Sequence, residues 1–413
     1  MEEEQARHFL QRFVEEFPAA VPEGGCLPVR GASSRLSLEE LEGEVLDVGL
    51  KMLAGRGAPA ATSVLLCQAA LSQLLQSDLS PFYCPQEEEE EPAVLLQSEL
   101  VQHLFLNKLI DIALLWHQNL PKMPATSSRF LQCCIHAIKN TRRKMEDKHV
   151  VLPEFNQLFN LQDGVDRAYY AVFDGHGGVD AAAYAATHLH VVVSKQESLQ
   201  TDAATALSSA FRRTDDMFRW KAQRERLRSG TTGVVVLIQG QELIVSWLGD
   251  SQAVLVRKGH TVPLMDPHKP DREDEKQRIE DLGGCITFMG CWRVNGMYAV
   301  SRAIGDFDQK PYVSGDADCS TTQLCGDEDY VLLACDGFFD AVNPSEVPHL
   351  VLEALQQPGG SEGGADGPLE LSAAHHLVAH AKAAGSTDNI TVMLVFLRPP
   401  EELLAADVSA AQQ

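Results

Sequence analysis

The sequence is short of positive charge and has neither a long apolar run nor a paired-cysteine motif. Lys and Arg number 34 against 58 Asp and Glu, so the formal net charge is -24. Such an acidic chain is repelled by nucleic acid and by anionic membrane surfaces, and we expect neither as a partner. No apolar stretch approaches the roughly 18 residues that a membrane-spanning helix needs. None of the ten cysteines forms a C-x-x-C pair, and the start Met1–Glu4 is acidic, unlike a secretory signal. We therefore expect a cytosolic or nuclear protein with reduced thiols.

Several familiar catalytic motifs are also missing. No cysteine is followed six positions later by Arg, which excludes phosphatases that use the C-x5-R thiolate loop. The phosphate-binding loop G-x-x-x-x-G-K-[ST] is absent, as is H-E-x-x-H. The motifs G-D-x-H-G and G-N-H-[ED], which mark another large class of metallophosphatases, do not occur. Composition is otherwise ordinary, with 45% apolar and 22% charged residues, so a sizeable core is expected.

The N-terminal third, residues 1–130, has helical patterning. Apolar residues recur at helical spacing in three stretches: 41–52, 65–75 (Leu65, Ala69, Leu71 and Leu75) and 99–115. Ser37 and Glu40 have the spacing of a capping box before the first of these helices. Glu87–Glu91 is a block of five like charges. Two interpretations of this block stay open, a solvated linker and a docking site for a basic partner.

From residue 131 onward, short β-rich runs replace the helical patterns. Strands are predicted at 168–173, 234–238, 243–248, 253–256, 330–334 and 390–396. The Gln239–Gln241 segment predicts a hairpin between the second and third of these strands. Helices are predicted at 180–193, 271–282, 345–356 and 369–384, and Gly359–Gly367 is predicted to be a surface loop. The tail beyond Pro399 is too short to form a domain.

Acidic residues stand repeatedly where a β-rich run stops or starts. The positions are Asp174-Gly175, Gly249-Asp250, Asp336-Gly337 with Asp340, Asp388-Asn389, and Glu146-Asp147 near the front. A single Asp-Gly is ordinarily a turn, but so many sites beside strands favour one shared site. Carboxylates brought together repel one another unless cations lie between them, and their oxygens suit magnesium or manganese.

Two divalent cations would fit the hydrolysis of phosphate monoesters, which is among the slowest reactions known without a catalyst. Two further residues have chemistry that suits this reaction. Arg142 carries a guanidinium that can hold two phosphoryl oxygens, and His176 can protonate a leaving alkoxide. Taken singly, Arg142 also fits a solvated surface charge and His176 a loop histidine.

Taken together, these segments resemble the metal-dependent serine/threonine protein phosphatases of the 2C type over roughly residues 131–398. The similarity rests on motifs in the same order and at fitting spacing, at 142–147, 172–178, 229–232, 248–251, 275–284, 294–306, 334–340 and 386–391. It implies an α+β fold, a four-layer α-β-β-α sandwich of two mainly antiparallel sheets flanked by helices, with a helical N-terminal extension. It also implies that water hydrolyses phosphoserine and phosphothreonine on proteins without a phosphoenzyme.

The resemblance also implies a role for each matching residue. Two manganese or magnesium ions would be held by Asp174 as the bridge, the carbonyl of Gly175, Glu146, Asp336 and Asp388. Asp147 would orient the attacking water. A weaker third ion would be held by Asp250, Asp336 and Asp340. Arg142 would hold the phosphate, and His176 would be the general acid.

Within that family, the sequence is most similar to the calmodulin-dependent protein kinase phosphatases, also described as partners of the PAK-interacting exchange factor. The similarity rests on the acidic helical extension with its glutamate block, on 140–147, and on A-C-D-G-F-F-D at 334–340. It implies that phosphorylated calmodulin-dependent and PAK kinases are substrates, that residues 1–130 bind regulators or the exchange factor, and that the protein is mainly cytoplasmic. Two rival functions stay open, a regulatory scaffold that acts through residues 1–130 and a hydrolase of small phosphoesters.

Overall fold

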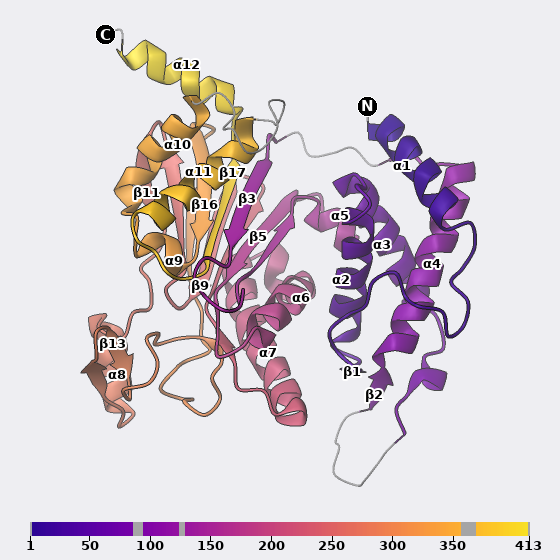
Figure 1. Ribbon diagram of the computed structural model, residues 1–413, viewed down its shortest axis with the longest axis horizontal. Helices are drawn as coiled ribbons and strands as arrows, with labels where there is room; N and C mark the ends of the chain where they lie inside the picture. Colours follow the sequence, from indigo (N-terminus) through magenta and orange to yellow (C-terminus); the bar gives the residue numbers. More distant parts are fainter. Residues whose placement is uncertain (1, 86–93, 124–128, 357–368, 412–413) are drawn as a thin grey trace. The chain divides into compact units, whose positions relative to one another are not determined.

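The computed structural model describes residues 2–85, 94–123, 129–356 and 369–411. The chain divides into two compact units (Figure 1). The first comprises Met1–Ser127 with Glu154–Gly164, and the second comprises Ser128–Pro153 with Val165–Gln413. The Glu87–Glu91 block and the Gly359–Gly367 loop both lie outside the described residues. No helix within the described ranges has the length and apolar character that crossing a membrane requires.

The first unit is built mainly from helices. They are α1 (Glu2–Glu16), α2 (Leu41–Ala54), α3 (Ala60–Leu75), α4 (Ser98–Gln118) and the short α5 (Phe155–Phe159). A single 3-10 turn, η1 (Ser80–Phe82), and two paired antiparallel strands, β1 (Arg35–Ser37) and β2 (Leu95–Gln97), complete it. Helices α2, α3 and α4 pack against one another, α1 packs against α4, and α5 packs against α3. The helices predicted at 41–52 and 99–115 are therefore present close to their predicted bounds.

Two local features explain how α2 is placed. A Cβ at Gly49 would lie 2.8 Å from both Cys67 Sγ of α3 and Phe105 Cε1 of α4, so only glycine permits this close approach. Before the helix, the Ser37 N–H donates to Glu40 Oε2 (2.8 Å) and the Glu40 N–H donates to Ser37 Oγ (3.3 Å). These two bonds are the reciprocal pair that the capping-box spacing predicts.

The buried face of α3 differs from the one that its sequence pattern indicates. Leu71 is buried, but Leu75 is 50% exposed. The other buried apolar residues are Val64, Leu66, Cys67, Ala70 and Leu74 rather than Leu65 and Ala69. Because α3 is apolar around most of its circumference, contacts with α2 and α4 decide which side chains are buried.

The second unit contains two five-stranded antiparallel sheets. The first has the order β11-β10-β16-β17-β3, and the second has the order β15-β9-β8-β5-β4. The strands of the first sheet are β3 (Gln132–Ile138), β10 (Gln252–Arg257), β11 (His260–Pro263), β16 (Glu328–Ala334) and β17 (Ile390–Phe396). Those of the second are β4 (Lys148–Leu152), β5 (Arg167–Phe173), β8 (Gly233–Gln239), β9 (Glu242–Leu248) and β15 (Asp318–Gln323). All six predicted strands are among them.

Smaller elements surround these sheets. The short strands are β6 (Gly175–His176), β7 (Gly230–Thr231) and β14 (Ile304–Gly305) in one small sheet, and β12 (Ile286–Phe288) and β13 (Trp292–Val294) in another. The helices are α6 (Asp180–Ser194), α7 (Ala203–Glu225), α8 (Glu273–Asp281), α9 (Asp336–Phe339), α10 (Val347–Gln356), α11 (Leu369–Ala383) and α12 (Pro400–Ala411). Two 3-10 turns are η2 (Glu197–Gln200) and η3 (Pro344–Glu346). The four helices predicted in this region correspond to α6, α8, η3 with α10, and α11.

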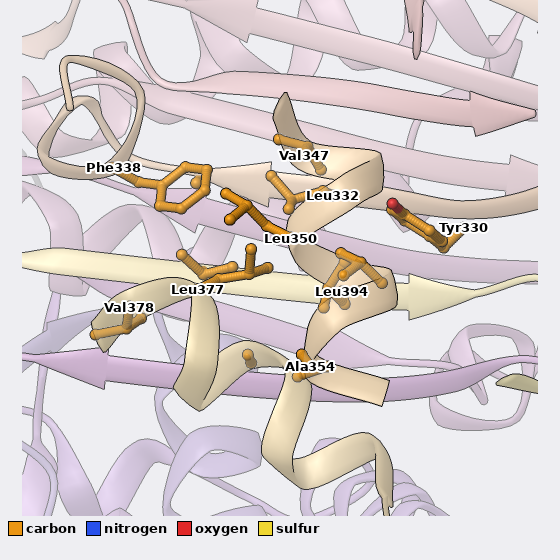
Figure 2. Packing of buried hydrophobic residues seen from close by; sticks show 14 of the residues in the cluster. Tyr330, Leu332, Phe338, Val347, Leu350, Ala354, Leu377, Val378 and Leu394 are labelled. Carbon is orange, nitrogen blue, oxygen red and sulfur yellow. The ribbon is translucent and has the colours of Figure 1, made fainter. Parts of the chain in front are cut away.

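Alternating side chains along β16 separate two layers of core. Leu332 belongs to a buried cluster with Leu350 of α10 and Leu377 of α11, and Figure 2 shows these side chains packed between the helices and the sheet. Val331 and Leu333 point the other way and join a second cluster. Successive side chains of a strand face opposite sides of its sheet, so this sheet is covered on both faces.

The second cluster lies between the two sheets. It combines Val331 of β16 with Val172 of β5 and Val236 of β8. Helices α6 and α7 contact the strands of the second sheet. A Cβ at Gly233 would lie 3.0 Å from Phe173 and 3.3 Å from Phe211 of α7, so α7 packs on the outer face of this sheet. The layers therefore follow the predicted α-β-β-α order (Figure 1).

The segment predicted only as a short tail forms helix α12. Its Leu403 is 5% exposed and belongs to the same cluster as Leu332 and Leu350. Helix α12 contacts α10. The tail therefore adds apolar contacts to the core of the second unit.

We expect Leu403→Ala to lower the free energy of unfolding of the second unit by about 2 kcal/mol, because it leaves a cavity against α10. The neighbouring exposed residue provides the matched control, and Glu402→Ala should stay within about 0.5 kcal/mol of the parent chain. Urea denaturation followed by tryptophan fluorescence measures both changes. Equal midpoints for the two variants would show that α12 adds no stability.

Candidate active site

Antiparallel pairing brings the predicted acidic residues to one edge of the sandwich. Strand β4 begins one residue after Asp147 and pairs with β5, which ends one residue before Asp174. In the same way, β17 begins two residues after Asp388 and pairs with β16, which ends two residues before Asp336. Each sheet therefore supplies two acidic residues from adjacent strand ends, where the backbone is held rigidly.

These strand ends border a cavity of about 770 Å³. Eight of the ten predicted site residues line it: Arg142, Glu146, Asp174, Gly175, His176, Asp250, Asp336 and Asp388. The other two, Asp147 and Asp340, lie beside these lining residues. The rim is exposed, because the side chain of Arg142 is 59% exposed and Met297 is 51% exposed. Basic residues that the metal argument does not use also line the cavity, namely Arg143, Lys144, Arg228 and Arg293.

The deepest part of the site offers oxygen ligands for a cation. Carboxylate oxygens of Asp147 and Asp174 lie within 4.8 Å of each other and of the Cys335 sulfur, a thiol whose pKa burial raises well above its ordinary value. Asp147 accepts a hydrogen bond from the Thr391 hydroxyl (2.6 Å), whereas its buried Oδ1 has no hydrogen-bond partner among the described residues. A buried carboxylate oxygen that lacks a donor costs free energy unless a cation binds it. Together with the other carboxylates around it, this donor set fits magnesium or manganese.

The carboxylates also disturb one another electrostatically. Burial, and then the charges of Asp336 and Asp147, raise the pKa of Asp174 well above its ordinary value. Burial is likewise the main cause that raises the pKa of Asp250 to about 7 and that of Asp147 to about 6. The pKa of Asp336 is raised by burial and by nearby carboxylates. Without cations, several of these groups therefore hold protons at pH values where ordinary carboxylates are ionised.

Of the three residues predicted to hold a third ion, Asp340 is the exposed one. Asp336 is the first residue of α9, and Asp340 directly follows the helix, one turn later. The Asp340 side chain is 62% exposed. Asp250 follows β9 and is 7% exposed. The ammonium of Lys269 lies 3.3 Å from Asp340 Oδ1. This group therefore already has a positive charge beside it.

Arg142 lies at the rim of the cavity. It ion-pairs with Asp388 (2.5 Å). Asn389 fixes the loop that carries Arg142, because its Oδ1 accepts from the Glu146 N–H (2.8 Å) and its Nδ2 donates to the Lys144 carbonyl (3.0 Å). Sequence reasoning gave Asn389 no role, although it lies inside the 386–391 motif.

His176 has a partner that sequence reasoning also missed. Its Nε2 donates to Asp306 Oδ2 (2.6 Å), and the Asp306 side chain is 1% exposed. Burial opposes the charge of His176, but the hydrogen bond and the charge of Asp306 outweigh burial and raise the histidine's pKa. Gly230 leaves room for this carboxylate, since a Cβ there would lie 2.3 Å from Asp306 Oδ2. The available signal was the Gly-Asp pair Gly305-Asp306, the same pair as Gly249-Asp250.

Comparison with known proteins adds sequence evidence to this geometry. The family model described as "Protein phosphatase 2C" matches residues 131–390. The chain is 52% identical to "Protein phosphatase 1F" of Homo sapiens, an alignment that covers 97% of this chain and 89% of that protein. It is also 52% identical to "Protein phosphatase 1E" of Homo sapiens over 89% of this chain, and it spans about half of that longer protein, 48%.

Solved structures show the same fold. One described as "Structure of a C.elegans sex determining protein" matches with a TM-score of 0.73 at 24% identity, over 90% of this chain and 91% of that one. A serine-threonine phosphatase 2C from Toxoplasma gondii matches with a TM-score of 0.53 at 20% identity, over 67% of this chain and 97% of that one. The predicted α+β fold with N-terminal helices is therefore confirmed.

Metal removal should expose the repulsion between the carboxylates. In a chelator, we expect Asp250→Asn to unfold at a higher temperature than the parent chain, because the amide removes one charge from the cluster. The folded-state pKa of Asp250 lies near 7, above its ordinary value of 3.8. As pH rises from about 4 to about 7, the unfolded chain therefore loses this proton before the folded chain does, and the parent chain loses stability.

The difference in melting temperature should accordingly widen across that pH range and level off above it, where Asp250 is ionised in the folded and the unfolded chain alike. Scanning fluorimetry in EDTA at several pH values measures the difference. A gap that does not change with pH would contradict the raised pKa of Asp250.

Proposed function

The chain belongs to the protein phosphatase 2C family and is a metal-dependent protein serine/threonine phosphatase, and on this premise we propose which residues carry the reaction and which substrates it serves. The observation that carries the proposal is a group of buried carboxylates with raised pKa values at the floor of an exposed cleft. Beside them stands a histidine that Asp306 keeps readily protonated. The exposed rim supports a polypeptide substrate over a small phosphoester, since an enclosed pocket would suit the latter better.

We assign the two tightly bound magnesium or manganese ions to Asp174, the Gly175 carbonyl, Glu146, Asp336 and Asp388, and a weaker third ion to Asp250, Asp336 and Asp340. When bound, such ions polarise the phosphoryl group and lower the pKa of water. Asp147, held by the Thr391 hydroxyl, orients the attacking water.

Arg142 and His176 act at the two ends of the phosphoryl group. The Arg142 guanidinium holds phosphoryl oxygens in two parallel hydrogen bonds. Water attacks phosphorus, the bond from phosphorus to the serine or threonine oxygen breaks, and His176 donates a proton to that oxygen. Because Nε2 of His176 is bound to Asp306, Nδ1 is the nitrogen that gives up the proton.

The proposed substrates are phosphorylated protein kinases, of the calmodulin-dependent and PAK types that the sequence resemblance implies. The basic side chains of Arg143, Lys144 and Arg293 around the cleft support substrates with acidic or additional phosphorylated residues near the scissile group. We propose that the N-terminal unit contributes to the choice of substrate or partner, the PAK-interacting exchange factor among them, and that the protein acts mainly in the cytoplasm. The alternative, a scaffold that acts mainly through this unit, predicts little catalysis.

The first test is phosphate release from a phosphothreonine peptide taken from a kinase activation loop. We expect release with manganese, none after chelation, and a loss of at least about 100-fold in Asp336→Asn, which removes a proposed ligand shared by two ion sites. Asp327→Asn is the matched control, because Asp327 pairs with Lys258 (2.8 Å) outside the cavity. No release from folded, metal-loaded protein would reject the catalytic assignment and favour the scaffold.

A second test isolates the proton donor through its partner. We expect Asp306→Asn to slow release from the phosphothreonine peptide by roughly 10- to 100-fold, because His176 loses the charge that keeps it protonated and oriented. Hydrolysis of p-nitrophenyl phosphate should change by less than about threefold, because its phenolate leaves without a proton.

Asp327→Asn, which lies outside the cavity and pairs with Lys258, serves again as the control and should leave both rates unchanged. Comparable losses on both substrates in Asp306→Asn would indicate that Asp306 supports the fold rather than His176.

A further inference from the structure

Lys269 is held at the third carboxylate group by a buried histidine. The neighbouring His268 is 0% exposed, and its Nε2 donates to Asp318 Oδ2 (2.9 Å). The Gly249 N–H donates to His268 Nδ1 (3.3 Å), and the ring stacks on Trp247 with centroids 5.8 Å apart. Gly249 directly precedes Asp250, so the same contact connects the lysine segment to the carboxylate group.

The ammonium at the end of this side chain faces several negative charges. It lies 3.3 Å from Asp340 Oδ1. The negative charges of Asp340, then Asp250, and also Asp336 attract it. These three carboxylates are the ones assigned above to the weaker third ion. Lys269 is therefore a positive charge tethered beside the proposed site for a mobile cation.

We propose that the Lys269 ammonium is a built-in competitor of the third divalent cation and weakens the binding of that ion. The inference rests on the assignment of Asp250, Asp336 and Asp340 to the third ion. An incoming dication is repelled by the ammonium and must displace it from Asp340, so part of the attraction of the carboxylates is already neutralised. A fixed cation also stands beside the second site, since Arg142 pairs with Asp388, but Arg142 is assigned to the phosphate, whereas Lys269 has no other assigned partner in the reaction.

The ammonium is also free to leave without disturbing the fold. The side chains of Lys269 and Asp340 are 47% and 62% exposed, so their ion pair contributes little to stability. The backbone is secured independently through His268. Removal of the Lys269 charge should therefore change ion binding while the folded structure is retained.

The test is isothermal titration of the metal-free full chain with magnesium, comparing the parent protein with Lys269→Gln. We expect three binding events in both, with the dissociation constant of the weakest lowered roughly tenfold by the substitution, a change of about 1.4 kcal/mol. The two tighter constants should stay within about threefold. Lys269→Arg keeps the charge and should retain weak binding.

A charge-matched control separates this local effect from net charge. Lys258→Gln removes the same charge from a lysine that is 69% exposed and paired with Asp327, and it should leave all three constants unchanged. The magnesium concentration that gives half-maximal phosphatase activity should fall in Lys269→Gln together with the weakest constant. Melting temperatures of the metal-free variants check that each protein is folded.

Two outcomes would overturn the inference. The weakest constant could stay unchanged or rise in Lys269→Gln, in which case Lys269 supports the site or has no effect on it. Alternatively, only two ions could bind to each protein, in which case no third ion exists for Lys269 to oppose. Failure of the proposed function would give a different result from failure of this inference. The parent protein itself would then lack the two tight binding events and the chelator-sensitive activity.

Discussion

Mutual repulsion among buried carboxylates is the constraint on which the site depends. Asp147, Asp174, Asp250 and Asp336 come from different strand ends, and burial with neighbouring charge raises the pKa of each. In an isolated chain these groups would move apart or take up protons. They stay together because each is attached at or next to a strand of an extensively buried sheet, where shifting one carboxylate would disturb the register of a whole ladder.

The second layer around the carboxylates fixes their positions without adding charge. The Thr391 hydroxyl holds Asp147, and Asn389 ties the loop before Glu146 to the start of β17. Gly337 also helps to fix these positions, because its backbone packs directly against the backbone of Asn389. A Cβ at Gly337 would lie 1.9 Å from the Asn389 carbonyl oxygen. Neutral donors suit this task, because added negative charge would increase the repulsion and fixed cations would compete with mobile ones. Fixed cations do occur at the exposed margin of the group, where Lys269 pairs with Asp340 and Arg142 pairs with Asp388.

The strands and most of the acidic residues could be predicted from sequence because both depend on local patterns. A β-rich run that stops at Asp174 or Asp336 predicts both the strand and the place where it ends, because the two signals lie in consecutive residues. The pairing of His176 with Asp306 could not be predicted, because 130 residues separate them and only the fold joins them. Helix α12 was not predicted for a similar reason. Its few apolar residues form no clear helical pattern by themselves, and their role follows only from the contact with α10.

The position of Asp306 outside the proposed ligand set has a consequence for the proton donor. In the absence of ions, Asp306, Asp250 and Glu146 all favour the charged form of His176. Cations held by Asp250 and Glu146 would cancel the contribution of those two residues and add repulsion of their own. The hydrogen bond from Asp306 would remain, because Asp306 is not assigned to any ion. A general acid next to divalent cations therefore needs a carboxylate that binds none of the ions. In this fold that carboxylate is Asp306, which directly follows β14 and fits beside Gly230 because glycine has no side chain.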